Sequence, residues 1–94
     1  MSDSVKLVVA DGQRKLQAVG WPNESASAIR ILTGEQIQAL GDGDWHLYRK
    51  RVRELIRHVS TNATLTDPDT IRAYDYLRHA IERETQRRET VTLL

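Results

Sequence analysis

The first part of the chain has the pattern of two β-strands, in which alternate side chains point to opposite faces. Val5 to Val9 is rich in β-branched residues and leucine, and farther on Leu16 and Ala18 alternate with polar neighbours. Val5, Leu7 and Val9 share one face of the first strand. Asp11-Gly12 lies between the two strands and favours a two-residue hairpin turn, because both residues tolerate a positive φ. The pattern predicts an antiparallel β-hairpin over about residues 4–20, and Pro22 ends it because proline cannot donate to a strand ladder.

The segment 23–32 fits two local structures, a helix or a strand. Its polar start, Asn23 to Ala26, could begin a short helix. The β-branched run from Ala28 to Leu32, with Gly34 close behind it, favours a third strand instead. We favour the strand.

Capping signals indicate a short helix over 34–40. Thr33 fits the N-cap, and Gln36 three residues later completes a capping-box pattern. Ile37 and Leu40 share one helical face, and Gly41 suits the position just after the helix, where the backbone often turns left-handed.

The best-defined element is a helix over about 45–60, which follows the turn Asp42-Gly43-Asp44. Asp44 is the expected N-cap. Apolar residues recur at helical spacing and form one stripe. This stripe comprises Trp45, Tyr48, Val52, Leu55, Ile56 and Val59.

A last helix is predicted over about 68–89, after a polar connection from Thr61 to Thr66. Asp67 is its expected N-cap, and Pro68 takes the first helical position, where the missing N–H costs nothing. The expected buried positions are Ile71, Tyr74, Leu77 and Ile81. Residues 91–94, which are apolar except for Thr92, could form a short closing strand or a docked tail.

These elements predict one small α+β domain over residues 1–94. An N-terminal antiparallel β-hairpin, with a third strand, is followed by a short helix and two longer antiparallel helices that pack against the sheet. A parallel sheet is not expected, because strands and helices do not alternate.

Composition narrows the function classes. The formal net charge is +1, so the whole molecule has no strong electrostatic preference. The absence of cysteine excludes disulfides and thiol chemistry and fits a reducing compartment. No apolar run approaches the ~20 residues of a membrane span, and Met1 to Ser4 lacks the start of a secretory signal. The expectation is a cytoplasmic protein without a membrane contact.

Positive charge is concentrated on one face of the helix 45–60. Residues 49–57 hold five basic residues and one acid, Glu54. At 100° per residue, one continuous row follows the helix beside its apolar stripe. This row, the basic stripe, consists of His46, Arg49, Lys50, Arg53 and Arg57, with Arg49 at its edge. It could contact phosphates, meet an acidic protein surface, or remain a solvated face.

The short helix, Gly41 and the basic helix share the outline of a helix-turn-helix over 33–57. Two residues argue against it. Ile37 stands where a small residue usually lets the helices approach, and Lys50 stands where an apolar residue would face inward.

No catalytic, cofactor or metal motif is found in the sequence. The three histidines are far apart and lack a close ligand pair. The acids Glu82, Glu84 and Glu89 are expected on a solvated helix surface, with Glu84 one turn from Arg88. No enzymatic activity and no cofactor are therefore expected.

Two apolar residues fall off the buried stripes of the long helices. Leu47 and Tyr76 are expected to be exposed, where they could anchor an interface or be scattered surface apolars. The resulting hypothesis is a small non-enzymatic protein-interaction module of regulatory, adaptor or inhibitor type, acting as a homodimer. The alternative is a nucleic-acid-binding regulator that uses the basic stripe.

Overall fold

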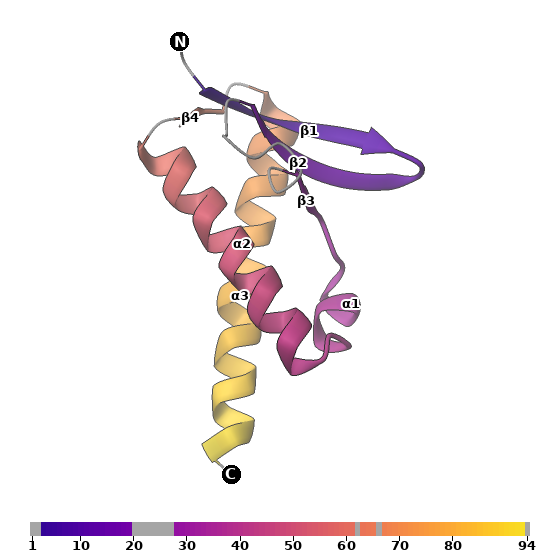
Figure 1. Ribbon diagram of the computed structural model, residues 1–94, viewed down its shortest axis with the longest axis vertical. Coiled ribbons are helices and arrows are strands. Elements are labelled where there is room, and N and C mark those ends of the chain that lie inside the picture. Colours follow the sequence, from indigo (N-terminus) through magenta and orange to yellow (C-terminus); the bar gives the residue numbers. More distant parts are fainter. Residues whose placement is uncertain (1–2, 20–27, 62, 66, 94) are drawn as a thin grey trace.

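The fold is α+β, as the sequence predicts. A computed structural model describes residues 3–19, 28–61, 63–65 and 67–93. The chain forms, in order, β1 (Asp3–Ala10), β2 (Gln13–Val19), β3 (Ala28–Arg30), α1 (Gly34–Gln38), α2 (Asp42–Thr61), β4 (Ala63–Thr64) and α3 (Pro68–Leu93). Figure 1 shows a small sheet at one end of two long helices, with α1 beside the start of α2. No helix in the described ranges is both long and apolar enough to cross a membrane.

The N-terminal hairpin forms with its turn at the predicted residues. β1 and β2 pair antiparallel from Ser4–Val19 to Ala10–Gln13, with Asp11 and Gly12 as the two turn residues. Both turn residues have positive φ, 54° and 74°, as a type I′ turn requires. The predicted end of the hairpin at Trp21-Pro22 lies outside the described residues.

The expected third strand is confirmed over a shorter stretch. β3 pairs antiparallel with β2, from Lys15–Arg30 to Gln17–Ala28. The N–H of Ile31 continues this pairing by donating to the carbonyl of Arg14 at 2.9 Å. Of the ambiguous segment 23–32, the described part is therefore extended, and residues 23–27 lie outside the description.

A fourth strand, which the sequence does not predict, adds one short parallel pair to the sheet. β4 lies within the expected polar connection and pairs parallel with β1, matching Asp3 with Ala63 and Ser4 with Thr64. The strand order is β3-β2-β1-β4. A strand of two residues, such as β4, is too short to show a periodic hydrophobic pattern in the sequence. The pairing arises because α2 returns the chain to the start of β1 (Figure 1).

Helix α1 begins as predicted, but the end of α1 and the start of α2 differ from the prediction. The capping box is confirmed: Thr33 Oγ1 accepts from Gln36 N at 3.1 Å, and Gln36 Oε1 accepts from Thr33 N at 2.9 Å. However, α1 ends at Gln38 with Ala39 as its C-cap, so Gly41 is not the residue after the helix. Gly41 instead precedes α2, and its carbonyl accepts from Trp45 N at 2.8 Å.

Asp44 consequently does not cap α2. The helix begins at Asp42, three residues earlier than predicted, and both Asp42 and Asp44 lie in its first turn. Carboxylates in this turn are favourable because they face the positive end of the helix dipole.

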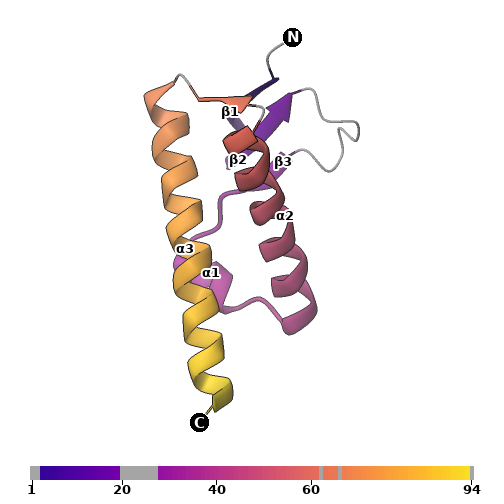
Figure 2. The same ribbon diagram turned by 90° about the vertical axis from the view of Figure 1, so that its left-hand side faces the viewer.

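α2 and α3 run antiparallel side by side, and Figure 2 shows that the last turns of α3 extend beyond the start of α2. The apolar stripe of α2 is confirmed, with its six residues buried or half-buried. On α3, the prediction for Ile71 is wrong: it is 39% exposed, and Thr70 takes the buried position. The helix continues to Leu93, so the strand or tail expected at 91–94 is wrong for its described residues.

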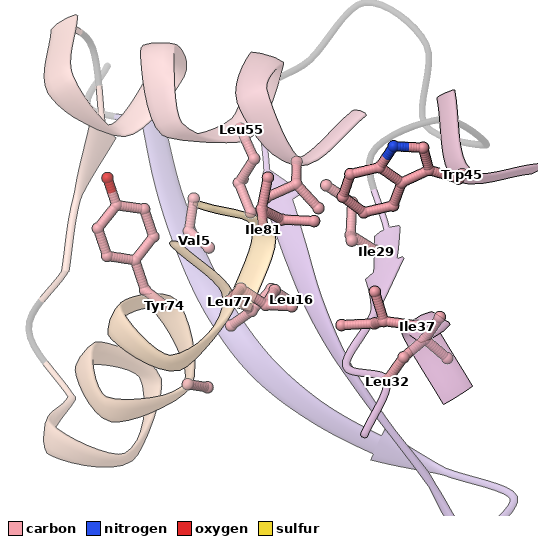
Figure 3. Close-up of a cluster of buried hydrophobic side chains, with 12 residues drawn as sticks. Val5, Leu16, Ile29, Leu32, Ile37, Trp45, Leu55, Tyr74, Leu77 and Ile81 are labelled. Carbon is pink, nitrogen blue, oxygen red and sulfur yellow. The ribbon is translucent and has the colours of Figure 1, made fainter. Parts of the chain in front are cut away.

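One apolar core joins every layer of the fold. Figure 3 shows side chains from the hairpin, β3, α1, α2 and α3 converging between the helices and the sheet. The least exposed members of this core are Leu16, Ile29, Ile37, Val52, Leu55 and Leu77. Because the cluster draws on all these elements, it fixes α2 and α3 against one face of the sheet.

A buried threonine links α3 to the edge of the hairpin. Thr70 Oγ1 accepts from the backbone N–H of Leu7 at 3.0 Å and donates to Asp67 Oδ2, also at 3.0 Å. Asp67 Oδ2 also accepts from the N–H of Thr70 at 3.2 Å, which confirms Asp67 as the N-cap.

Replacing this hydroxyl tests the link. Thr70→Val keeps the shape but leaves the Leu7 N–H without its acceptor, so we expect a loss of about 1–3 kcal/mol in the free energy of unfolding. Urea denaturation measures this change in the free energy of unfolding. Thr90→Val is the matched control, because the Thr90 hydroxyl is exposed and bonds its own helix. Equal effects of the two substitutions would contradict a specific role for Thr70.

Candidate functional site

The basic stripe lies on the outer side of α2, as predicted. His46, Lys50, Arg53 and Arg57 are exposed, and Arg49 is half-buried at the edge of the row. Since the helix rises 1.5 Å per residue, the row is about 16 Å long. Lys50 faces solvent, which also argues against a helix-turn-helix, and α1 has only five residues.

Arg49 connects the basic stripe to the aromatic end of α2. Its guanidinium carbon lies 5.8 Å from the centroid of the Trp45 ring, within the range of a cation–π contact. Its Nη2 lies 3.5 Å from His46 Nδ1. Arg51, a neighbour in sequence, points elsewhere: its Nη2 donates to the carbonyl of Ala28 at 2.7 Å, at the start of β3.

The most connected side chain of the site, Arg88 on α3, is absent from the candidate residues that the sequence predicts. Its Nη2 donates to the carbonyls of Leu40 at 2.9 Å and Ile37 at 3.2 Å. Its Nη1 lies 3.6 Å from Asp42 Oδ1. Arg88 therefore joins the end of α1, the start of α2 and the late turns of α3.

The same guanidinium stacks on Trp45 and pairs with Glu84. Its carbon lies 4.7 Å from the Trp45 ring centroid, and its Nε donates to Glu84 Oε2 at 2.9 Å. Trp45 is thus contacted by two arginines, Arg49 and Arg88. We call the group of Trp45, Glu84 and Arg88 the corner cluster.

Glu84 is buried, contrary to the expectation of a solvated helix surface. Its side chain is 5% exposed, while that of Arg88 is 19% exposed. Arg87 also donates to Glu84, from Nε at 2.6 Å and from Nη2 at 2.8 Å. Hydrogen bonds from Arg87, together with those from Arg88, hold the pKa of the Glu84 carboxyl below its ordinary value.

A groove of about 660 Å³ adjoins the corner cluster. It lies where the end of α3 passes the α1–α2 corner. Its lining combines apolar side chains, cations and two acids, and the groove shares His46 and Arg49 with the basic stripe. The lining also includes Leu40, Asp42, Trp45, Arg87, Arg88, Glu89 and Val91.

The two predicted interface residues lie away from this groove. Leu47 is exposed on the flank of α2 and lines a separate hollow beside β3. Tyr76 is exposed on α3, but its hydroxyl donates to the carbonyl of Leu32 at 2.7 Å. Neither residue is among those that line the groove.

Tyr76 has a counterpart on α2 that supports the same part of the chain. The Tyr48 hydroxyl donates to the carbonyl of Arg30 at 2.6 Å. Burial of the Tyr48 side chain raises its pKa to about 12. Both tyrosines therefore secure the segment that leaves β3.

The described residues contain no group of three or more histidine, cysteine, aspartate or glutamate side chains placed to hold a metal ion. Comparison with known proteins adds no functional lead: no protein-family model matches the chain, and no curated protein or solved structure is significantly similar to it.

The corner cluster predicts an acid-sensitive contribution to stability. Glu84→Gln should lower the free energy of unfolding at neutral pH by about 3 kcal/mol, the scale for removing one partner of a buried ion pair. Because the pKa of Glu84 is lowered in the folded protein, this contribution is complete above its ordinary value of 4.5. It is lost as the pH falls through the lowered pKa.

Denaturation of both proteins at a series of pH values tests this. The difference between wild type and Glu84→Gln should be constant above pH 4.5 and shrink in more acidic solution. Glu82→Gln serves as the control, because Glu82 is exposed on the same helix. A difference that persists unchanged in acid would refute the ion-pair explanation.

Proposed function

We propose that this protein is a non-enzymatic protein-interaction module of regulatory, adaptor or inhibitor type. The observation that carries the proposal is the continuity of the groove and the basic stripe. His46 and Arg49 belong to both, so an apolar-floored concavity and a row of cations form one surface.

The groove together with the basic stripe has the composition typical of a protein interface. Such interfaces place an apolar centre within a polar rim, and tryptophan and arginine are enriched among their strongest contacts. The corner cluster also makes the groove rigid, because Arg88 fixes α1, α2 and α3 to one another. A pre-organised surface loses less conformational entropy when it binds.

The homodimer expected from the sequence stays a prediction. Its basis is that the two amphipathic helices could extend a core between subunits. Those apolar faces are packed within one chain, where Val52, Leu55 and Leu77 are at most 1% exposed. Sedimentation equilibrium tests self-association, and a strict monomer would remove this part of the proposal. A cytoplasmic location is likewise part of the proposal, and the cysteine-free composition supports it.

Site-directed photo-crosslinking in the cells that produce the protein tests the proposed surface. A photo-reactive residue at Lys50, in the basic stripe, should form adducts with a discrete protein partner. The same residue at His79 should not, because His79 lies on the face of α3 opposite its buried side. Adducts are detected by mass shift and identified by mass spectrometry.

The two positions together decide the result. A discrete protein adduct at Lys50, and none at His79, supports an interaction module that uses this surface. Adducts that are equally abundant at both positions, or none at either, would sink the proposal.

Nucleic acid is the second candidate partner, favoured by one observation. The exposed cations of α2 stand in one row, so they could follow a phosphate backbone. The near-neutral net charge argues against it, since dedicated nucleic-acid domains are usually far more basic.

Fluorescence anisotropy with labelled DNA and RNA over a range of salt concentrations tests this candidate. If it holds, binding should weaken steeply with salt, and Arg53→Glu/Arg57→Glu should abolish it. Arg72→Glu/Arg83→Glu on α3 changes the net charge by the same amount and should have little effect. Binding that is absent at low salt would eliminate nucleic acid as the partner.

A further inference from the structure

We infer that the groove binds an acidic, amphipathic peptide segment of a partner protein. This inference rests on the proposed function and specifies the chemistry of the partner. Three features of the described residues support it. The groove has an apolar floor, some cations on α2 lack acidic partners among these residues, and acids on the rim would repel a nucleic acid but not a peptide with suitably spaced charges.

The apolar floor contains a side chain that folding leaves uncovered. Val91, on the last turn of α3, is 59% exposed and lines the groove together with Leu40. Covering such side chains is favourable in proportion to the apolar area removed from water. A partner therefore needs apolar side chains of its own.

The cations of the groove fall into two groups. Arg87 and Arg88 are already bonded to Glu84, and Arg88 also lies near Asp42. Arg49 forms no salt bridge with the described residues, and the same holds for Lys50 and Arg53 farther along α2. The positive charge left for a partner therefore lies on α2.

The spacing of these cations suits carboxylates on a peptide. Arg49 and Arg53 are four residues apart, which places them about 6 Å apart along the axis of α2. Two carboxylates separated by one helical turn have the same spacing. Apolar residues between such turns would reach the floor, which is the arrangement by which a helix binds in a groove.

A peptide fits the rim better than a nucleic acid does. Asp42 and Glu89 also line the groove and would repel an unbroken row of phosphates. A peptide can place carboxylates opposite Arg49 and neutral residues opposite these two acids. A second copy of this chain that docked through the same face would bring its own basic stripe and Arg87, which do not complement the cations of α2.

Selection from a random peptide library tests the inference while the natural partner is still unidentified. Sixteen-residue peptides displayed on phage are selected on the immobilised full chain. We expect enriched peptides to carry more Asp and Glu than Lys and Arg, with apolar residues three or four positions apart. Synthetic copies of the enriched peptides are then titrated by fluorescence anisotropy.

Matched variants locate the contact. Arg49→Glu/Arg53→Glu should weaken binding about tenfold or more, since it turns attraction into repulsion. Arg72→Glu/Arg83→Glu, which alters the charge equally on α3, should change it less than twofold, about the effect of a distant surface site. Val91→Ala should weaken binding several-fold, whereas Ile71→Ala, also an exposed apolar residue of α3, should not.

The inference is overturned by a library that yields no enriched peptides or peptides without an acidic excess. It is also overturned if the Arg49 and Arg53 reversal leaves binding intact, or if DNA or a second copy of the chain occupies the groove in preference to the peptides. Discrete protein adducts at Lys50 combined with such a failure would keep the proposed function and discard the acidic peptide alone.

Discussion

The buried ion pair between Glu84 and Arg88 holds together the end of the molecule where α3 passes the α1–α2 corner. A carboxylate that is 5% exposed needs compensating partners, and Arg87 and Arg88 supply them. Arg88 also donates to the carbonyls of Ile37 and Leu40 and stacks on Trp45. These bonds hold the end of α3 against the α1–α2 corner. The groove lies between these two parts of the chain, so its shape depends on these bonds.

The opposite end of the molecule is held by a different kind of contact. There the sheet provides the frame, and Thr70 connects α3 to β1 through the N–H of Leu7. Between the two ends, the apolar core fills the space under both long helices (Figure 3). The outer side of α2 is therefore left for solvent or a partner, and its cations lie on a helix whose apolar stripe is packed in the core.

The sequence allowed the prediction of elements whose signals are local. Asp11-Gly12 specifies its turn, Thr33 and Gln36 form a capping box, and the stripe of α2 follows its helical period. The missed features depend on tertiary contacts. β4 is too short for a pattern, and the burial of Glu84 depends on where α1 ends. The sequence shows Glu84 and Arg88 one helical turn apart, but the same spacing is common on solvated helices. The burial of this pair, and with it the groove, could therefore not be predicted.

The central claim is that Arg88 fixes the α1–α2 corner and thereby shapes the groove. Native-state hydrogen exchange of Arg88→Lys tests it most directly, since lysine keeps the charge but cannot make the same set of bonds. Local opening should raise the exchange rates of the amides from Ile37 to Trp45, while those of the β1–β2 hairpin keep their wild-type protection. Unchanged protection at the corner, or an equal loss throughout the described residues, would contradict the account.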